Sequence, residues 1–137
     1  MIDYLFTEEQ EMIRDLSRQI TDEEIRPVAA ELDRTGKFPR GVMNVMAKSD
    51  LFGLYIEEKY GGMSGGIMEV CIATEEFSKG CGGIAISYAA SALGTYPIML
   101  FGTEEQKQKF LPRLASGEKM AAFGLTEPSA GSDASAM

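Results

Sequence analysis

Residues 126–133 form a turn-like segment whose side chains are suited to ligand binding. The Thr126 hydroxyl can donate or accept a hydrogen bond, and Pro128 stiffens the backbone that follows it. Gly131 and its small neighbours let the backbone approach a ligand closely. Successive amides there, with the Ser132 hydroxyl, are able to form an anion-binding nest for a phosphate. The same residues also suit an ordinary turn at the end of a strand, so a phosphate-bearing ligand is one of two interpretations.

The rest of the sequence offers little nucleophilic or metal chemistry. The chain has no histidine, which excludes Ser-His-Asp sites, Cys-His sites and histidine-liganded metals within it. Cys71 and Cys81 lack a CxxC spacing and lie in apolar helical patterns, which predicts buried, reduced thiols. The acidic pairs at 57–58 and 75–76 are typical of solvated faces. We therefore predict no catalytic residue and no metal ligand in this chain.

The charge and composition limit the partners that the chain can have. Its 21 acidic and 13 basic residues give a net charge of −8, without the Lys/Arg cluster that holds a phosphate backbone, so nucleic acid is not an expected partner. The 45% of hydrophobic residues is typical of a soluble globular protein. No apolar run is expected to reach membrane-spanning length and the start is not basic, so we expect no membrane partner, no leader peptide and a cytoplasmic location.

The first third of the chain has the pattern of two helices. A capping box at residues 7–10 begins the first, and Pro27 within it predicts a bend or a restart before Gly36 ends it. A second helix is expected from about residue 39 to 51. Gly53 is a plausible glycine cap for that helix.

The middle of the chain predicts a loop followed by two helices. Glycines make residues 53–66 a loop, and a helix is expected over 67–79 with one apolar face inward. The next helix, about 83–93, is apolar nearly all round, and Gly94 and Pro97 are expected to break it. A helix without a polar face belongs in the middle of a bundle or against a ligand.

The last third of the chain changes from a helical to an extended pattern. A helix begins with a second capping box at residues 103–106 and ends near Gly117. Residues 120–126 have the pattern of a strand, which needs a partner strand. The expected fold class is all-α, a helical bundle with one short β segment at its C-terminal end. The expected domains are an all-α domain at 1–118 and the truncated start of a β domain at 119–137.

Four segments in order along the chain resemble sequences of the acyl-CoA dehydrogenase family. They are FTEEQ at 6–10, EEKYGG at 57–62, FGTEEQKQKFLPRLASG at 101–117 and FGLTEPSAGSD at 123–133. Their order and spacing cover the chain from end to end, which makes the resemblance specific. It implies the family's helical N-terminal domain, followed by the first strand of its β middle domain.

The resemblance also implies an FAD site, of which this chain holds one wall. By the match to the family's motif, backbone groups of Phe123 and Leu125 meet the flavin ring, and the Thr126 hydroxyl bonds near the reactive N5 edge. Ser132 contacts the pyrophosphate and lies beside the pantetheine of the acyl-CoA, while Gly131 allows this close approach. The remaining flavin contacts are expected downstream, so the site would be incomplete here.

The apolar helix gains a second interpretation from the resemblance. In the family an acyl chain lies between two helices of the N-terminal domain. Ile86, Ala89, Ala90 and Leu93 would then shape the far end of the acyl pocket, and Tyr88 would shorten it. Plain bundle core remains the alternative for each of these residues.

The implied activity is the oxidation of an acyl-CoA thioester to the trans-2-enoyl-CoA, with FAD as hydride acceptor. The family's catalytic glutamate is expected downstream, so the piece alone is expected to be inactive. An acyl-CoA oxidase or a flavin monooxygenase of the same superfamily, or a non-catalytic helical interaction module, stays open. An electron-transfer flavoprotein partner and a homotetramer are implied for the complete protein.

Overall fold

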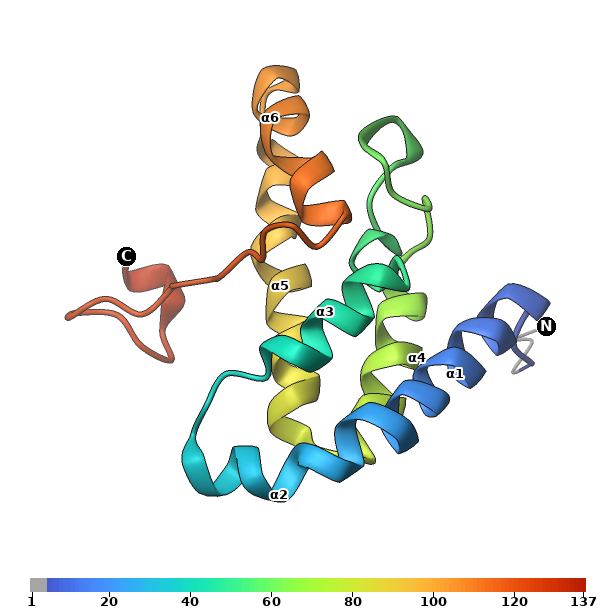
Figure 1. Ribbon diagram of the computed structural model, residues 1–137. Coiled ribbons are helices and arrows are strands. Elements are labelled where there is room, and N and C mark those ends of the chain that lie inside the picture. The colour runs from blue at the N-terminus through green and yellow to red at the C-terminus, as the bar shows by residue number, and fades with distance from the viewer. Residues whose placement is uncertain (1–4) are drawn as a thin grey trace.

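Helix α1 (Glu8–Ile20) leads through a π-helical turn (Thr21–Ile25) into α2 (Arg26–Thr35) in the computed structural model, which describes residues 5–137 (Figure 1). The capping box predicted at Thr7 is confirmed, because the Gln10 amide donates to the Thr7 hydroxyl at 3.2 Å and the Gln10 side chain accepts from the Thr7 amide. The restart predicted at Pro27 takes the form of this wider turn. Since Pro27 has no N–H and its ring crowds the carbonyl four residues back, a π turn just before it relieves the clash.

Helix α3 (Arg40–Lys48) is shorter than the sequence predicts, and the glycine cap expected at Gly53 is wrong. Asp50, with a φ of 57°, takes the left-handed conformation instead, and residues Leu51–Gly53 form a 3₁₀ turn. This tighter turn buries both Leu51 and Phe52. Gly53 packs against the loop that follows, and a Cβ there would make an ordinary contact with the Cα of Gly62 at 3.4 Å.

The loop predicted over 53–66 is confirmed, and it folds back on itself around a 3₁₀ turn (Glu58–Tyr60). Its glycines allow this close fold, since a Cβ on Gly62 would lie 2.0 Å from the carbonyl oxygen of Ile56. The loop is tied to the last helix by the buried Tyr60, whose hydroxyl donates to the Glu104 carboxylate at 2.9 Å.

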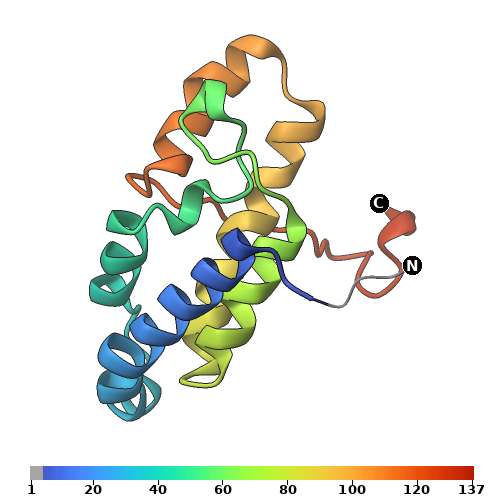
Figure 2. The same ribbon diagram turned by 90° about the vertical axis from the view of Figure 1, so that its right-hand side faces the viewer.

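Helices α4 (Ile67–Ser78), α5 (Gly82–Phe101) and α6 (Glu104–Ala115) complete the bundle. Helix α4 packs against both α1 and α5 and lies between them, as the two views in Figure 1 and Figure 2 show. Tyr88 of α5 holds the centre of the core, with its ring 5.2 Å from Phe77 of α4 and 5.5 Å from Phe52. The predicted helical bundle is therefore confirmed.

Helix α5 does not break at Gly94 and Pro97, and that expectation is wrong. Pro97 lies on the exposed face of α5. Because proline has no N–H, one helix carbonyl lacks its usual donor, and water can hydrogen-bond to that carbonyl instead. With 20 residues and a mean hydropathy of 1.4, α5 is also long and apolar enough to cross a membrane, which corrects the expectation that no run reaches that length. The core helix of a soluble protein meets the same criterion of length and composition.

The strand expected at 120–126 is not formed in the part of the chain that the structure describes. The only β feature there is an isolated antiparallel bridge between Glu127 and Ala130. Beyond residue 122 the chain extends away from the helices (Figure 1). A strand has no ladder to join without a neighbour, which explains why the extended pattern stays unpaired.

Candidate functional site

An apolar groove with a cavity volume of about 620 Å³ runs between α4 and α5. Ile86, Ala89, Ala90 and Leu93, the four residues expected to shape an acyl pocket, all line it from α5. We call this cavity the α4–α5 groove. Its other lining residues are Ile67, Val70, Cys71, Thr74, Glu75, Ser78, Ala92 and Tyr96. The structure therefore gathers the four predicted residues on one wall of the groove.

The α4 wall of this groove was missed by the sequence reasoning. Cys71 was expected to be buried, but it is exposed on the groove side of α4, and Cys81 is only partly buried. The signal was present, since Val70, Thr74 and Ser78 recur at the spacing of one helical face. A helix that carries small or apolar residues on two faces has a core on one side and a second contact on the other.

The α5 wall exposes more apolar surface than a bundle needs. Ile86 is 69% exposed and Leu93 is 53% exposed, with the small Ala89 and Ala90 between them. Contiguous exposed apolar surface of this kind marks a contact with a ligand or with another part of a protein. Helix α5 thus lies with one face in the core and the other unpaired among the described residues.

Tyr88 does not shorten the groove, which corrects that expectation. Its side chain is turned into the core, and its hydroxyl donates to the carbonyl oxygen of Leu51 at 2.9 Å. Burial raises the pKa of this hydroxyl far above its usual range. Tyr88 is therefore a neutral core residue.

The chain that leaves α6 crosses α5 at the level of Leu93. The Ala121 amide donates to the Ser91 hydroxyl at 3.2 Å, and the backbone of Ala122 lies against Gly94. From Leu93 to Ile86 the helix rises roughly 10 Å, at about 1.5 Å per residue. One end of the groove is therefore level with the start of the 123–133 segment, and the end at Ile86 is remote from it.

The five residues expected to contact a flavin all lie on one exposed segment. Phe123 and Leu125 are 44% and 43% exposed, and Thr126, Gly131 and Ser132 are exposed as well. Within the part of the chain that the structure describes, the peptide groups of 123–126 have no hydrogen-bond partner. Such a free edge of alternating donors and acceptors fits the polar rim of a planar ring such as isoalloxazine.

The phosphate nest expected at Gly131 and Ser132 is not preformed. Gly131 does not take the left-handed backbone that alternates in such a nest, and a Cβ built on it would meet nothing within 4 Å. The turn is instead closed by paired hydrogen bonds between Glu127 and Ala130, at 3.0 and 3.1 Å. The Ser132 hydroxyl remains exposed for a ligand.

One carboxylate expected to be solvated is buried. Glu76 is 3% exposed, while its neighbour Glu75 is exposed as expected. Glu76 accepts from Arg18 of α1 at 3.1 Å and from Lys79 at 2.8 Å. Burial alone would raise the pKa of Glu76, but the hydrogen bonds and charges of the two cations outweigh it and lower the pKa. Glu76 thus joins α1 to α4.

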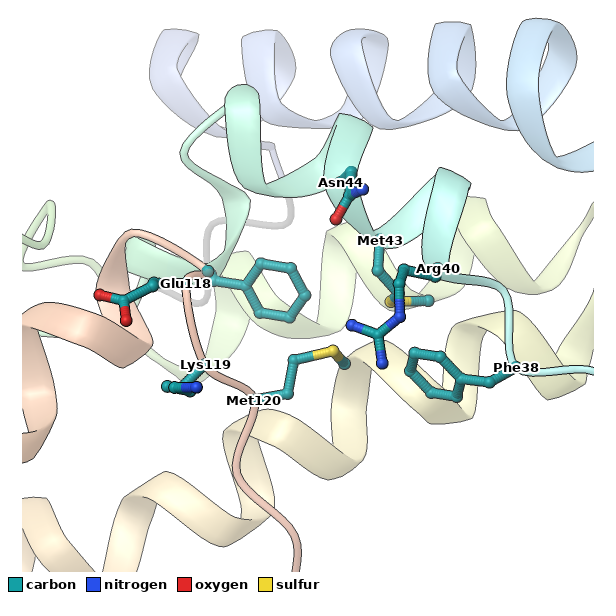
Figure 3. Close-up of a pocket in the computed structure, with 9 residues that line it drawn as sticks. Phe38, Arg40, Met43, Asn44, Glu118, Lys119 and Met120 are labelled. Carbon is teal, nitrogen blue, oxygen red and sulfur yellow. The ribbon is translucent and has the colours of Figure 1, made fainter.

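A second pocket, of about 400 Å³, lies between α3 and residues 117–120 (Figure 3). Figure 3 shows the Arg40 side chain beside Phe38 and Met120, and its guanidinium lies 5.5 Å from the centre of the Phe38 ring. None of the residues that the sequence marked for ligand binding lines this pocket. This pocket is the alternative location for a ligand.

Comparison with known proteins identifies the family to which this helical bundle belongs. The family model described as "Acyl-CoA dehydrogenase, N-terminal domain" matches residues 7–118. The chain therefore belongs to the acyl-CoA dehydrogenase family, and the resemblance seen in the sequence is confirmed.

Individual relatives agree with this assignment over nearly the whole chain. The chain is 43% identical to the short-chain-specific acyl-CoA dehydrogenase of Clostridium acetobutylicum, covering 98% of this chain and 36% of that protein. It is also 43% identical to the acryloyl-CoA reductase (NADH) of Anaerotignum propionicum, covering 99% and 34%. The solved structure of butyryl-CoA dehydrogenase from Megasphaera elsdenii matches with a TM-score of 0.91 at 37% identity, covering 98% and 36%. The chain spans about a third of the length of these relatives.

Proposed function

We propose that the full-length protein containing this chain is an FAD-dependent acyl-CoA dehydrogenase whose acyl chain lies in the α4–α5 groove. The observation that carries this proposal is the coincidence of two features. The four residues expected for an acyl pocket line one apolar groove, and residues 121–122, which lead directly into the segment that matches the flavin motif, cross the same helix near one end of it. The family membership supplies the reaction class.

The crossing point gives the groove a direction. The thioester lies at the end near Leu93, level with the segment 123–126, and the acyl tail points toward Ile86. Ala89 and Ala90 leave space between these two larger side chains. The walls are almost entirely apolar, which suits a hydrocarbon chain and excludes water from it.

The segment 123–132 holds one side of the cofactor in this proposal. The free peptide edge of Phe123 and Leu125 binds the rim of the ring, the Thr126 hydroxyl donates near N5, and the Ser132 hydroxyl binds the pyrophosphate with Gly131 leaving room for it. When bound, FAD supplies the acceptor for the hydride that leaves the β carbon. The residues of this chain bind and orient both groups, and the base that takes the α proton lies outside the chain.

The remaining features of the complete protein are proposals of the same kind. Residues 1–118 form the helical domain, and residues 119–137 begin a β domain that provides the strand partners missing here. Helix α6 ends at Ala115, the Lys119 amide makes the last hydrogen bond of the turn that follows, and residues 120–126 are extended, which supports this boundary. The family resemblance supports an electron-transfer flavoprotein partner and a homotetramer.

A reductive direction is the second candidate function. One relative, the acryloyl-CoA reductase (NADH) of Anaerotignum propionicum, is as similar to this chain as the Clostridium acetobutylicum dehydrogenase, at 43% identity for each. The groove and the flavin-facing segment would serve either direction, because both require an acyl chain beside a flavin.

The test is an anaerobic titration of the purified full-length protein, followed by its visible absorbance. We expect bound flavin whose absorbance is bleached by a saturated acyl-CoA without any other reductant. Bleaching by NADH and recovery on adding an enoyl-CoA, with no bleaching by acyl-CoA, would favour the reductive direction. A protein that binds no flavin, or whose flavin responds to neither thioester, contradicts the proposal.

A further inference from the structure

Helix α5 makes two different contacts on two of its faces. Ala89, Ala90 and Leu93 line the groove, whereas Ser91 and Gly94 meet the chain that returns from α6. At about 100° per residue the mean directions of these two sets differ by roughly 120°, so they lie on two different faces of the helix. One rigid element therefore carries both the acyl wall and the attachment point of the flavin-facing segment.

A buried hydrogen-bond chain makes the first part of that attachment. The Ala121 amide donates to the hydroxyl of Ser91, which is 1% exposed. The Ser91 carbonyl in turn accepts from the Thr95 hydroxyl at 2.7 Å, and Thr95 accepts from the Tyr55 hydroxyl at 3.3 Å. Burial raises the pKa of Tyr55 to about 12, so this hydroxyl keeps its proton at neutral pH.

Close backbone contact at Gly94 makes the second part. A Cβ on Gly94 would lie 2.9 Å from the Cβ of Ala121 and 2.9 Å from the carbonyl carbon and oxygen of Ala122. Two of these atoms belong to backbone and cannot rotate away. Glycine is thus required for residues 121–122 to lie this close to the helix, and it explains why a helix-weakening residue stands in the middle of α5.

We propose that Ser91 and Gly94 are positioning residues, which together set the height and distance at which residues 123–126 leave α5 relative to the acyl wall at Leu93. The proposal rests on the proposed function, because the separation that they fix is that between the flavin rim and the acyl chain. Neither residue touches the reacting atoms. They act through the backbone of Ala121 and Ala122.

The effect on the reaction follows from its geometry. Hydride transfer needs the β carbon and the flavin in near-attack contact, and a displacement of about 1 Å costs roughly 100-fold in rate. Affinity for the acyl-CoA depends on the groove walls on the other face of α5, which these residues do not line. The two properties should therefore separate in variants of Ser91 and Gly94.

The test compares Gly94→Ala and Ser91→Ala with two control variants in the same helix. A Cβ on Gly82 meets nothing within 4 Å, and the Ser87 hydroxyl bonds only to the carbonyl of Gly83, one turn back. The controls are therefore Gly82→Ala and Ser87→Ala. Each full-length variant is measured for amide hydrogen exchange over 119–126, flavin absorbance spectrum, acyl-CoA dissociation constant and the single-turnover rate of flavin reduction.

We expect both test variants to speed exchange at residues 120–122, to shift the flavin spectrum and to slow flavin reduction by about 10- to 100-fold. Their acyl-CoA dissociation constants should stay within about threefold of the unmodified protein, and the controls should change none of these readouts. Where Gly94→Ala fails to fold, Ser91→Ala, which removes one oxygen atom, still decides the outcome.

Each failure has a distinct meaning. Unchanged exchange at 120–122 overturns the attachment itself. Faster exchange with an unchanged reduction rate and flavin spectrum overturns the positioning role and leaves the proposed function standing. An unmodified protein without flavin overturns the proposed function, while the exchange measurement still reports on the attachment.

Discussion

Ala90 is the residue at which the width of the groove is most simply tested. It stands opposite the α4 wall between the larger Ile86 and Leu93, so a longer side chain there fills the path toward Ile86. In Ala90→Leu we expect kcat/KM for long acyl-CoA substrates to fall by roughly 10- to 200-fold and for the shortest substrates to change little.

A matched control for that variant exists on the outside of the bundle. Ala30 is exposed on α2, so Ala30→Leu adds the same atoms away from the groove and should leave the chain-length profile unchanged. An equal loss of kcat/KM for short and long substrates in Ala90→Leu would show that the acyl chain does not follow this path.

Glu76 is a buried carboxylate whose ionisation makes the folding stability depend on pH. Its lowered pKa in the folded protein means that the unfolded state binds the proton more tightly. The ionised Glu76 therefore contributes its full stabilisation at pH values well above the ordinary carboxyl pKa of 4.5. That stabilisation is lost as the pH falls through the lowered pKa of the folded protein.

Thermal unfolding of Glu76→Gln across pH 3–7 measures this contribution. Because Arg18 and Lys79 are about half exposed, we expect a loss of only about 1–2 kcal/mol at neutral pH, and little difference from the unmodified protein at the acidic end. A gap that persists unchanged at low pH would assign the effect to packing and not to charge.

At the scale of elements, α5 shows where sequence reasoning stops. The two capping boxes were read correctly because Thr7 and Thr103 bond to residues three positions on, which is a local rule. The sequence predicted that Gly94 would break the helix. Glycine is needed there because Ala121 and Ala122 pack against it, and this contact with a later segment cannot be seen in the local sequence. Likewise, the burial of Glu76 depends on Arg18, which the local sequence of α4 does not reveal.

Proline disfavours the interior of a helix, so α5 must be kept helical at Pro97 by its packing in the bundle. A substitution at Pro97 tests this. Replacing it with alanine restores an N–H inside the helix on an exposed face, so Pro97→Ala should raise the unfolding free energy by about 1–3 kcal/mol. Pro27 stands in the first turn of α2, where proline is tolerated. Pro27→Ala is therefore the control, and a calorimetric midpoint raised no more by Pro97→Ala than by this control would contradict the account.

At the scale of the whole molecule, the bundle presents two surfaces that its described residues leave unpaired. One is the α4–α5 groove, and the other is the extended segment 123–126. The sequence predicted the α5 wall and the motif segment through resemblance, but not the α4 wall, because burial on two faces of α4 requires knowing which helices flank it. The predicted strand stayed unpaired for a related reason, since pairing depends on a neighbour.

The most direct test of the central claim locates the acyl tail in the full-length protein. Acyl-CoA analogues with a photoreactive diazirine on the terminal carbon are bound, irradiated and mapped by peptide mass spectrometry. We predict labelling of residues that line the α4–α5 groove, moving from near Leu93 toward Ile86 as the acyl chain lengthens. Labelling at the pocket of Phe38, Arg40 and Met120, or labelling that does not move with chain length, would contradict the claim.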